Sequence, residues 1–359
     1  MIHHTPRGRQ DVQEILQFVN DQHLSHHSIS WVKDKSKKMK VPMPAVLAEN
    51  NAFCVTGGAS LLSLAIAKLL LNRGNKIKII TRNEEEIADD REKIEALDTA
   101  GALQLERNES IVAVAADPNV VGSLIEVFDG CVGVFHTGEF IDPAGLSGYT
   151  QSMVGVEVKT TENVLKACAR TPSVKKCVLT SSLLACVWSD NSPNVDHNSW
   201  SDETLCFNKK LWYALGKVRA EIAAWRLSKE NILQFAAICP ALITGDDYLA
   251  RHRAPTLAYV KGGREMFLRG LLATVAVRKL AEAHIRAFEA MNWKRFICYD
   301  EIVESIEDAE KLAKEMGIPT SRLRGDVPIN DSERCIIFRT ALPQLARYSS
   351  HCYSQLLFF

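Results

Sequence analysis

The sequence predicts an α/β protein of the Rossmann type, with a doubly wound parallel sheet and a smaller C-terminal substrate-binding part. Three observations support this fold class. Short apolar runs alternate with helical stretches between residues 52 and 239. A Thr56-Gly57-Gly58 turn separates the first run from an apolar helix. Tyr213 and Lys217 stand four residues apart at the start of a later helix, which places their side chains on one face.

The first half of the predicted sheet has four strands, and a helix follows each of them. The strands are continuous apolar runs, which is typical of strands buried on both faces of a parallel sheet. They are expected at 52–56, 76–81, 111–116 and 131–136. The helices carry apolar residues at helical spacing. They are expected at 61–72, 84–97, 120–128 and 149–170.

Two further strands continue the alternation. They are expected at 174–182 and 233–239, with a helix at 209–229 between them. After Gly245 the pattern is less regular, and the elements there are expected to form the smaller part, interleaved with the C-terminal strands. They comprise a strand at 271–277, a helix at 278–291, a strand at 295–299 and a helix at 306–316.

Three segments divide the chain. Residues 1–50 form an N-terminal extension that we expect to be poorly ordered, with one amphipathic helix at 11–21. Its basic run at 33–40 is interpreted as a solvated linker, with a nuclear or acidic-partner signal as the alternative. Residues 51–330 form the main domain. Residues 331–359 are apolar but interrupted, and no role is assigned to them.

The composition excludes several classes of function. The chain has 359 residues, of which 47% are hydrophobic, and its formal net charge is +0. That balance argues against nucleic acid or an anionic membrane as the main partner. No apolar run reaches the ~18 residues of a membrane span. Asp11 and Glu14 near the N-terminus argue against a secretory signal or a transit peptide.

The ten cysteines and ten histidines show no metal-ligand spacing. Several cysteines lie in apolar, strand-like runs, so we expect buried reduced thiols, a cytoplasmic protein and no metal site. The histidines of the N-terminal extension are interpreted as solvated; they are His3, His4, His26 and His27.

Tyr213 and Lys217 are the candidate acid–base pair. An ammonium beside a phenol lowers the pKa of the phenol, so Tyr213 could exchange a proton near neutral pH. A serine of Thr180-Ser181-Ser182, held at the end of a strand, could bind the same substrate oxygen. Any isolated pair at this spacing is more often an exposed helical pair. The order of strand, serines, tyrosine and lysine after a nucleotide-type turn favours chemistry at a carbonyl or carbinol.

The segment 52–72 has the strand, turn and helix of a dinucleotide-binding site. Gly57 makes the tight turn, and the helix that starts at Leu61 offers N–H groups to a pyrophosphate. Ser60 and Ser63 stand where the fingerprint has glycines, and these side chains could crowd the site by about 1–3 kcal/mol. The Ser60 hydroxyl could itself bind phosphate. We expect dinucleotide binding to be retained, with Thr56, Gly57, Ser60 and Leu61 in contact with the ligand.

Arg82 follows the second strand, where an arginine accepts a 2′-phosphate, so it favours NADP over NAD. Three acidic residues at 84–86 would oppose a phosphate if they faced it; their expected role is the first turn of a helix. Asp117 follows the third strand. It is assigned either to the adenine edge or to a helix N-cap before Pro118.

A set of ordered motifs resembles the plant extended short-chain reductases, most closely the cinnamoyl-CoA reductase and dihydroflavonol reductase group. The motifs are Thr56-Gly57, the segment 133–137, Thr180-Ser181-Ser182, Tyr213 to Lys217 and the segment 239–245. The resemblance covers roughly 52–320. It implies NADPH-dependent reduction of a carbonyl or thioester in a small, phenylpropanoid-like aromatic molecule.

The resemblance also implies individual roles. Ser182 polarises the carbonyl oxygen, with Ser181 as the adjacent alternative, and Tyr213 donates the proton. Lys217 lowers the pKa of the tyrosine and holds the nicotinamide ribose. The residues implied on the nicotinamide side are Thr137, Pro240 and Leu242.

The sequence departs from cinnamoyl-CoA reductases beside the tyrosine. Leu211 and Leu215 replace an asparagine and a second tyrosine, so the resemblance leaves the substrate open. A second hypothesis is a catalytically degenerate protein with a reductase fold that binds a nucleotide or a partner. Epimerase or dehydratase chemistry on a nucleotide sugar shares the fold and is disfavoured by the surroundings of Tyr213. The oligomeric state is not predicted.

Overall fold

The computed structural model describes residues 50–99, 110–138, 149–189, 193–245, 257–290, 294–324 and 334–340. The helix expected at 11–21 and the basic run at 33–40 lie outside the described residues.

A seven-stranded parallel sheet forms the centre of the molecule, in the order β10-β7-β5-β4-β1-β2-β3. Its strands are β1 (Ala52–Thr56), β2 (Lys76–Thr81), β3 (Ile111–Ala115), β4 (Cys131–His136), β5 (Lys176–Thr180), β7 (Gln234–Pro240) and β10 (Lys294–Cys298). The predicted doubly wound parallel sheet is therefore confirmed. The order reverses between β1 and β4, and such a switch point opens a crevice at the carboxyl ends of the strands.

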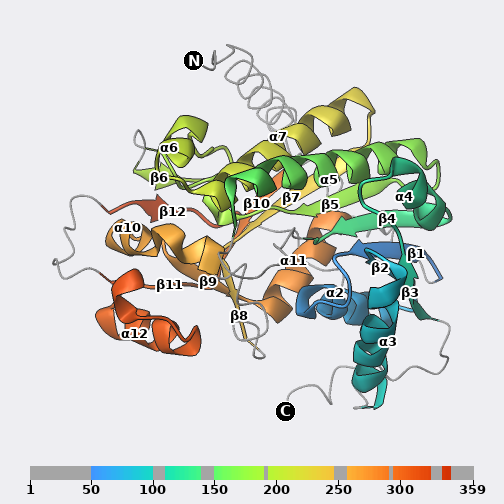
Figure 1. Cartoon of the computed structure of the whole chain (residues 1–359), viewed down its shortest axis with the longest axis horizontal. Coiled ribbons are helices and arrows are strands. Elements are labelled where there is room, and N and C mark those ends of the chain that lie inside the picture. The colour runs from blue at the N-terminus through green and yellow to red at the C-terminus, as the bar shows by residue number, and fades with distance from the viewer. Residues whose placement is uncertain are drawn as a thin grey trace, which may run out of the picture.

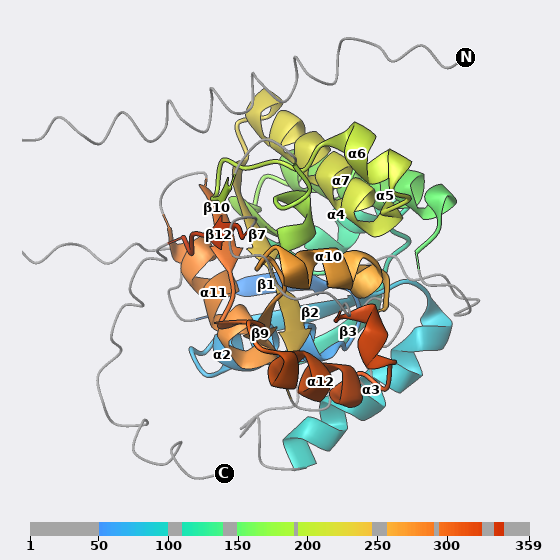
Figure 2. The same cartoon turned by 90° about the vertical axis from the view of Figure 1, so that its left-hand side faces the viewer.

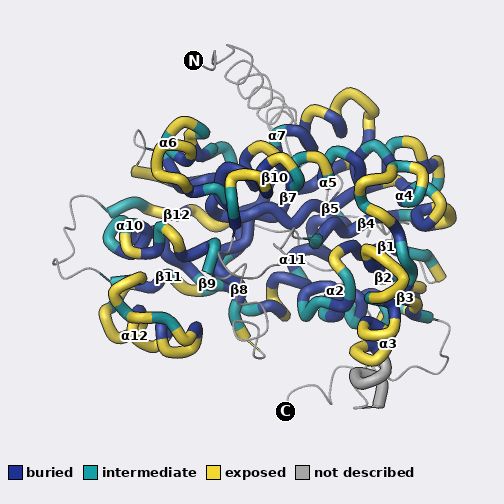
Figure 3. The backbone as a smooth tube through the Cα atoms, in the orientation of Figure 1, coloured by how far each residue is buried: buried dark blue, intermediate teal, exposed yellow. Residues whose placement is uncertain are grey.

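Helices cover both faces of the sheet, and each face has its own apolar core (Figures 1 and 3). One face is covered by α2 (Leu61–Leu71), α3 (Glu84–Thr99) and α11 (Val277–Glu289). The other face is covered by α4 (Val121–Phe128), α5 (Gln151–Arg170) and α7 (Trp212–Glu230). Their residues are buried at helical spacing because each helix turns one stripe towards the sheet.

The expected smaller part packs beside the carboxyl ends of the strands (Figure 2). It contains a three-stranded sheet of β8 (Leu242–Thr244), β9 (Ala273–Ala276) and β11 (Glu301–Ile302). Two helices belong to it, α10 (Gly263–Leu268) and α12 (Ile306–Glu315). A two-residue strand, β12 (Ile336–Ile337), pairs with β6 (Asn194–Val195) and brings part of the C-terminal segment onto the domain.

Some expected elements have different bounds. The strand expected at 174–182 ends at Thr180, because Ser182 caps a 3₁₀ turn at Leu183–Ala185. The helix expected from residue 209 begins at Trp212. A short helix, α6 (Glu203–Asn208), precedes it, and Lys210 has a φ of 55°, which ends helical geometry between the two. None of the helices described is both long and apolar enough to be a membrane span.

Candidate active site

A cavity of about 840 Å³ lies at the carboxyl ends of the first four strands. Its lining residues follow β1, β2, β3 and β4 and include part of α5. Five of the expected contact residues line it: Thr56, Gly57, Ser60, Leu61 and Arg82. The volume is in the range of small-molecule and cofactor sites. The crevice at the switch point is therefore a formed cavity.

The turn after β1 leaves no room for side chains. Gly57 has a φ of 93°, and a Cβ there would lie 2.9 Å from the Gly138 Cα. Gly58 has a φ of 62°, and its Cβ would lie 2.9 Å from an Asp90 carboxylate oxygen. Both positions favour glycine for their backbone angle as well as for space. The turn can thus present bare backbone to a ligand, as the sequence predicted for Gly57.

The two serines that replace glycines are held by hydrogen bonds. Ser60 caps α2, and its Oγ accepts from the Ser63 N–H at 3.2 Å. The Ser63 side chain is fully buried, and its Oγ lies 2.8 Å from the Ser60 Oγ and 3.0 Å from the Thr137 Oγ1. Thr137 in turn donates to the Thr56 carbonyl. A chain of hydroxyls therefore occupies the helix–strand contact, so the hydroxyl of Ser63 is bonded rather than crowded.

The far end of the cavity carries charges of both signs. Arg82 forms an ion pair with Glu86 at 2.8 Å, and the cavity lining also includes Asp89, Asp90 and Lys93. The three acidic residues at 84–86 do form the first turn of α3, as expected, but Glu86 additionally faces Arg82. Both partners are exposed, and such surface pairs contribute about 0–1 kcal/mol, so an anion can compete for Arg82.

Asp117 is not the N-cap of α4, and it is not among the residues that line the cavity. Its carboxylate accepts from the Asn119 backbone N–H at 2.8 Å and forms a turn ahead of α4. The helix itself begins at Val121, with Val120 as an N-cap residue that makes no side-chain cap bond. The cavity is lined instead by its neighbours Ala116 and Pro118. The Asp117 side chain therefore stabilises the loop rather than the helix terminus.

Two buried polar atoms of the cavity lining have no hydrogen-bond partner among the described residues. They are Asp90 Oδ2 and Thr160 Oγ1. Buried polar groups are nearly always satisfied, so these atoms mark places where a polar ligand or water belongs. Together with the bare glycine turn and the N-terminus of α2, they fit the ribose and pyrophosphate groups of a dinucleotide.

Tyr213 and Lys217 lie on one face of α7 and are buried, contrary to the exposed-pair alternative. The Lys217 Nζ lies 5.5 Å from the centroid of the Tyr213 ring. Neither residue belongs to the lining of the large cavity. The link between them is Glu157 on α5, which does line the cavity and binds Lys217.

Glu157 was not singled out from the sequence. Its Oε1 lies 2.9 Å from the Lys217 Nζ, and both side chains are buried, 6% and 2% exposed. Its Oε2 accepts from the Tyr149 hydroxyl at 3.4 Å. The Tyr149 ring packs edge-on against the Tyr213 ring, with centroids 5.2 Å apart. The signal was available, because Glu157 falls on the apolar stripe of α5 between Met153 and Val164.

His136, at the end of β4, lines the cavity close to this pair. Burial lowers its pKa to about 4, with the Glu157 charge raising it and the Lys217 charge lowering it. The ring is thus neutral near pH 7. Its Nδ1 lies 2.8 Å from the Thr56 Oγ1, which fixes the ring beside the glycine turn.

The two candidate serines at the end of β5 have different environments. The Ser181 hydroxyl donates to Glu221 on α7 at 2.5 Å. Glu221 is fully buried and paired with Arg295 of β10 at 2.6 Å. The Ser182 hydroxyl accepts from the Leu184 N–H at 3.2 Å, which leaves its own proton for another acceptor. The Ser181 hydroxyl therefore donates its proton to Glu221, a buried carboxylate that belongs to an ion pair within the fold.

The residues expected on the nicotinamide side are all buried at strand ends. Thr137 follows β4, Pro240 ends β7 and Leu242 begins β8. None is in the lining of the large cavity, although Gly138, next to Thr137, is. Thr137 supports the glycine turn through the hydroxyl chain. Pro240 and Leu242 sit where the central sheet passes into the smaller part.

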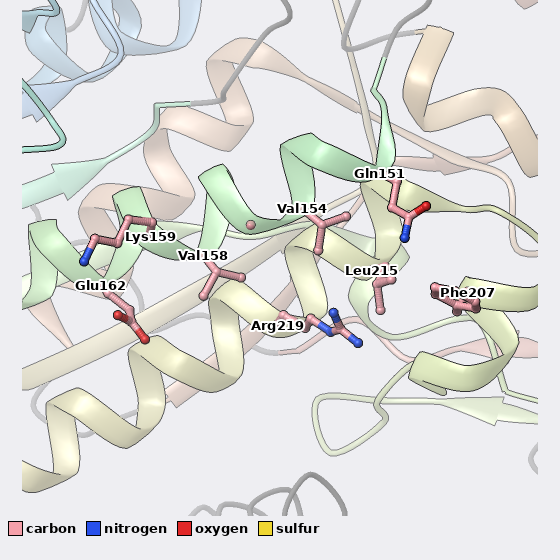
Figure 4. Close-up of a pocket in the computed structure, with 9 residues that line it drawn as sticks. Gln151, Val154, Val158, Lys159, Glu162, Phe207, Leu215 and Arg219 are labelled. Carbon is pink, nitrogen blue, oxygen red and sulfur yellow. The ribbon is translucent and has the colours of Figure 1, made fainter. Parts of the chain in front are cut away.

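A second cavity, of about 430 Å³, lies between α5, α6 and α7 (Figure 4). Leu215 lines it together with Val154, Phe207 and Arg219. Leu215 is one of the two substituted positions beside Tyr213, and it is in the lining of this groove rather than of the cavity at the strand ends.

Comparison with known proteins agrees with this architecture. Residues 54–298 match the 3-beta hydroxysteroid dehydrogenase/isomerase family. Cinnamoyl-CoA reductase 1 of Petunia hybrida is 32% identical over 279 residues, which are 74% of this chain and 79% of that protein. Tetraketide alpha-pyrone reductase 1 of Arabidopsis thaliana is 32% identical over 267 residues, 71% of this chain and 78% of that protein.

Among solved structures, the yeast methylglyoxal/isovaleraldehyde reductase Gre2, complexed with NADPH, superposes with a TM-score of 0.60. The match covers 82% of this chain and 94% of that chain at 19% identity. At this identity the likeness concerns the fold. The resemblance of the sequence to the cinnamoyl-CoA and dihydroflavonol reductase group is confirmed by the relatives at about 30% identity.

Proposed function

The chain belongs to the 3-beta hydroxysteroid dehydrogenase/isomerase family, among the extended short-chain reductases, and from that membership we propose that it is an NADPH-dependent reductase. Its substrate in this proposal is a small aromatic molecule of the phenylpropanoid kind that carries an aldehyde, ketone or thioester. The observation that carries the proposal is the buried Tyr213–Lys217 pair beside a cavity built from a glycine turn at the sheet's switch point.

NADP(H) fits the cavity, and when bound it supplies the hydride. Thr56, Gly57 and Ser60 would hold the pyrophosphate, with Leu61 at the start of α2. Arg82 would exchange Glu86 for the 2′-phosphate, since a phosphate dianion is the stronger partner. Gly57 and Gly58 exclude side chains from the turn, so a ligand can approach the backbone closely.

The chain's own residues then handle the proton. Tyr213 donates the Oη proton to the carbonyl oxygen as negative charge develops there. The Ser182 hydroxyl donates a hydrogen bond to the same oxygen, which lowers the energy of that charge. The proton that Ser182 retains supports its assignment over Ser181, whose hydroxyl binds Glu221. We also propose a cytoplasmic location, because the cysteines of the described residues are free thiols and most of them are buried.

Replacement of Tyr213 tests the proposal. We expect Tyr213→Phe to lower kcat for NADPH oxidation with an aromatic aldehyde by ~10²-fold or more, because the proton donor is lost. NADPH affinity, measured by fluorescence titration, should change little. Tyr299→Phe is the control, since that hydroxyl donates to the Ile337 carbonyl in the smaller part. Equal turnover of Tyr213→Phe and wild type would show that the mechanism is wrong.

A catalytically degenerate binding protein is the second candidate. Ser60 already accepts a helix N–H, and Arg82 is already paired, so both cofactor contacts have competitors within the chain. The fluorescence titration separates the two candidates. Saturable NADPH binding supports the reductase, and no binding at millimolar cofactor supports the degenerate protein.

A further inference from the structure

A buried carboxylate stands beside the proposed acid–base pair. The Glu157 Oε1 lies 2.9 Å from the Lys217 Nζ, and the Glu157 Oε2 lies 3.4 Å from the Tyr149 hydroxyl. The Tyr149 ring contacts the Tyr213 ring, with their centroids 5.2 Å apart. The carboxylate therefore reaches Tyr213 by two routes, through the ammonium on one side and through a second phenol on the other.

This contact is an ion pair in the interior, not at the surface. The Lys217 and Glu157 side chains are 2% and 6% exposed. A buried ammonium without a partner is strongly disfavoured, so Glu157 holds the Lys217 side chain in place and keeps it charged. The pair as a whole is neutral. The simple expectation, that Lys217 brings one uncompensated positive charge to Tyr213, is therefore incomplete.

Three other titratable groups near the pair come from α7, from β4 and from the segment before α5. Tyr213 is on α7 with Lys217, Tyr149 precedes α5, and His136 ends β4. Burial lowers the pKa of His136 to about 4, so it adds no charge near pH 7. Of the charged side chains in the described residues, Lys217 lies over the Tyr213 ring and Glu157 binds Lys217, while Glu221, one turn further along α7, is paired with Arg295.

We propose that Glu157 is a positioning residue for the Tyr213–Lys217 pair, which fixes the Lys217 ammonium and offsets its charge beside the Tyr213 phenol. The inference rests on the proposed function in that Tyr213 is taken as the proton donor. In this proposal the acid–base group consists of three residues from two helices, Tyr213 and Lys217 of α7 and Glu157 of α5. The acidity of the phenol then depends on the balance between the two charges rather than on the lysine alone.

The signs of the expected effects follow from that balance. Removing the carboxylate leaves a positive charge that favours tyrosinate, so Tyr213 should ionise at lower pH. Removing the ammonium leaves a negative charge that disfavours tyrosinate, so Tyr213 should ionise at higher pH. Removing both should return the midpoint close to that of the wild type. Each single shift should be about one pH unit, given a charge a few ångströms away in a partly screened interior.

The experiment titrates Tyr213 directly, in the protein without cofactor or substrate. The tyrosinate ultraviolet difference spectrum is recorded against pH for wild type, Glu157→Gln, Lys217→Met and the double variant. Each titration is corrected with its partner that also carries Tyr213→Phe. Glu162→Gln is the matched control, because Glu162 is on the same helix but pairs with Lys166 and Arg226 near the surface.

The proposal predicts opposite shifts for the two single variants, a restored midpoint for the double variant and no shift for Glu162→Gln. If Glu157→Gln alone does not fold, the double variant provides the comparison, because replacing both members of a buried ion pair is often tolerated. The titration midpoint of Tyr213 should then still be lower in the double variant than in Lys217→Met alone. A Glu157→Gln midpoint equal to that of the wild type, or a double-variant midpoint equal to that of Lys217→Met, would overturn the proposal. Failure of the wild type to oxidise NADPH would count against the proposed function alone, because this titration needs no turnover.

Discussion

Ser181 and Ser182 show how adjacent residues of the same type can have separate tasks. Ser181 turns its hydroxyl to the buried Glu221, whereas Ser182 caps the 3₁₀ turn and keeps a proton to donate. The distinction depends on α7, which delivers Glu221 to the end of β5. The sequence could name the two serines as alternatives but could not choose between them.

Substitution of each serine separates these tasks. We expect Ser182→Ala to lower kcat by ~10²-fold with little loss of stability, because the hydrogen bond to the developing oxyanion is lost. Ser181→Ala should instead lower the free energy of unfolding by about 1–3 kcal/mol, since the buried Glu221 carboxylate loses one of its hydrogen-bond donors. Steady-state kinetics and urea unfolding of both variants measure these effects. The reverse pattern would assign the oxygen-binding role to Ser181.

The glycine positions were predicted correctly as a turn but not in their detail. Gly57 has the positive φ that the fingerprint requires. The consequence of serine at 60 and 63 could not be derived from spacing, because one partner of the Ser63 hydroxyl is Thr137, which follows β4 and is 74 residues away in the sequence. Glu157 was missed for the same reason. An acidic residue on an apolar stripe signals a buried partner without saying which residue it is.

At the scale of elements, one buried ion pair connects α7, β10 and the segment after β5. Arg295 of β10 binds Glu221 of α7 at 2.6 Å. The same guanidinium donates to the backbone carbonyls of Ala185, His197 and Ser199. The Arg295 Cζ also lies 3.9 Å from the centroid of the Trp200 ring. The loop that begins at Ser182 is thereby tied to the far edge of the sheet.

Breaking this pair should be costly. We expect Arg295→Met to lower the free energy of unfolding by about 3–5 kcal/mol, because Glu221 is left buried and uncompensated. Arg219→Met is the matched control, since its pair with Glu203 is largely exposed and contributes about 1 kcal/mol or less. Urea unfolding measures both. A loss for Arg295→Met no larger than for Arg219→Met would show that the pair is not what holds the loop.

The long elements were predictable and the short ones were not. The seven strands of the central sheet and the long helices lie within a few residues of their expected positions, because each repeats its apolar period several times. β8, β11, β6 and β12 have two or three residues each, too few to show a period. They exist because neighbouring backbone is held in register, so tertiary packing rather than local pattern defines them.

At the scale of the whole molecule, two buried histidines lie against neighbouring central strands of the sheet, His136 at the end of β4 and His284 beside β5. His136 lies between Thr56 and Thr161, and His284 of α11 lies 2.7 Å from the Thr180 Oγ1. Both are enclosed by the cores on which the fold depends. Burial lowers the pKa of each to about 4. Their protonation is therefore coupled to unfolding of the entire domain.

This coupling predicts an acid sensitivity. The unfolded chain binds a proton at each histidine below about pH 6.5, while the folded chain does so only near pH 4. Their full contribution to stability is present above pH 6.5 and is lost as the pH falls towards 4, by up to ~1.4 kcal/mol per pH unit for each histidine. Urea unfolding between pH 7 and pH 5 measures this slope for the wild type and for His284→Gln. Because Gln does not titrate, the free energy of unfolding of the variant should depend less steeply on pH. The difference in slope from the wild type should equal about the contribution of one histidine, whatever the stability of the variant at pH 7. Equal slopes would show that His284 takes up its proton equally in the folded and unfolded chains, and the acid sensitivity would then have to come from other groups.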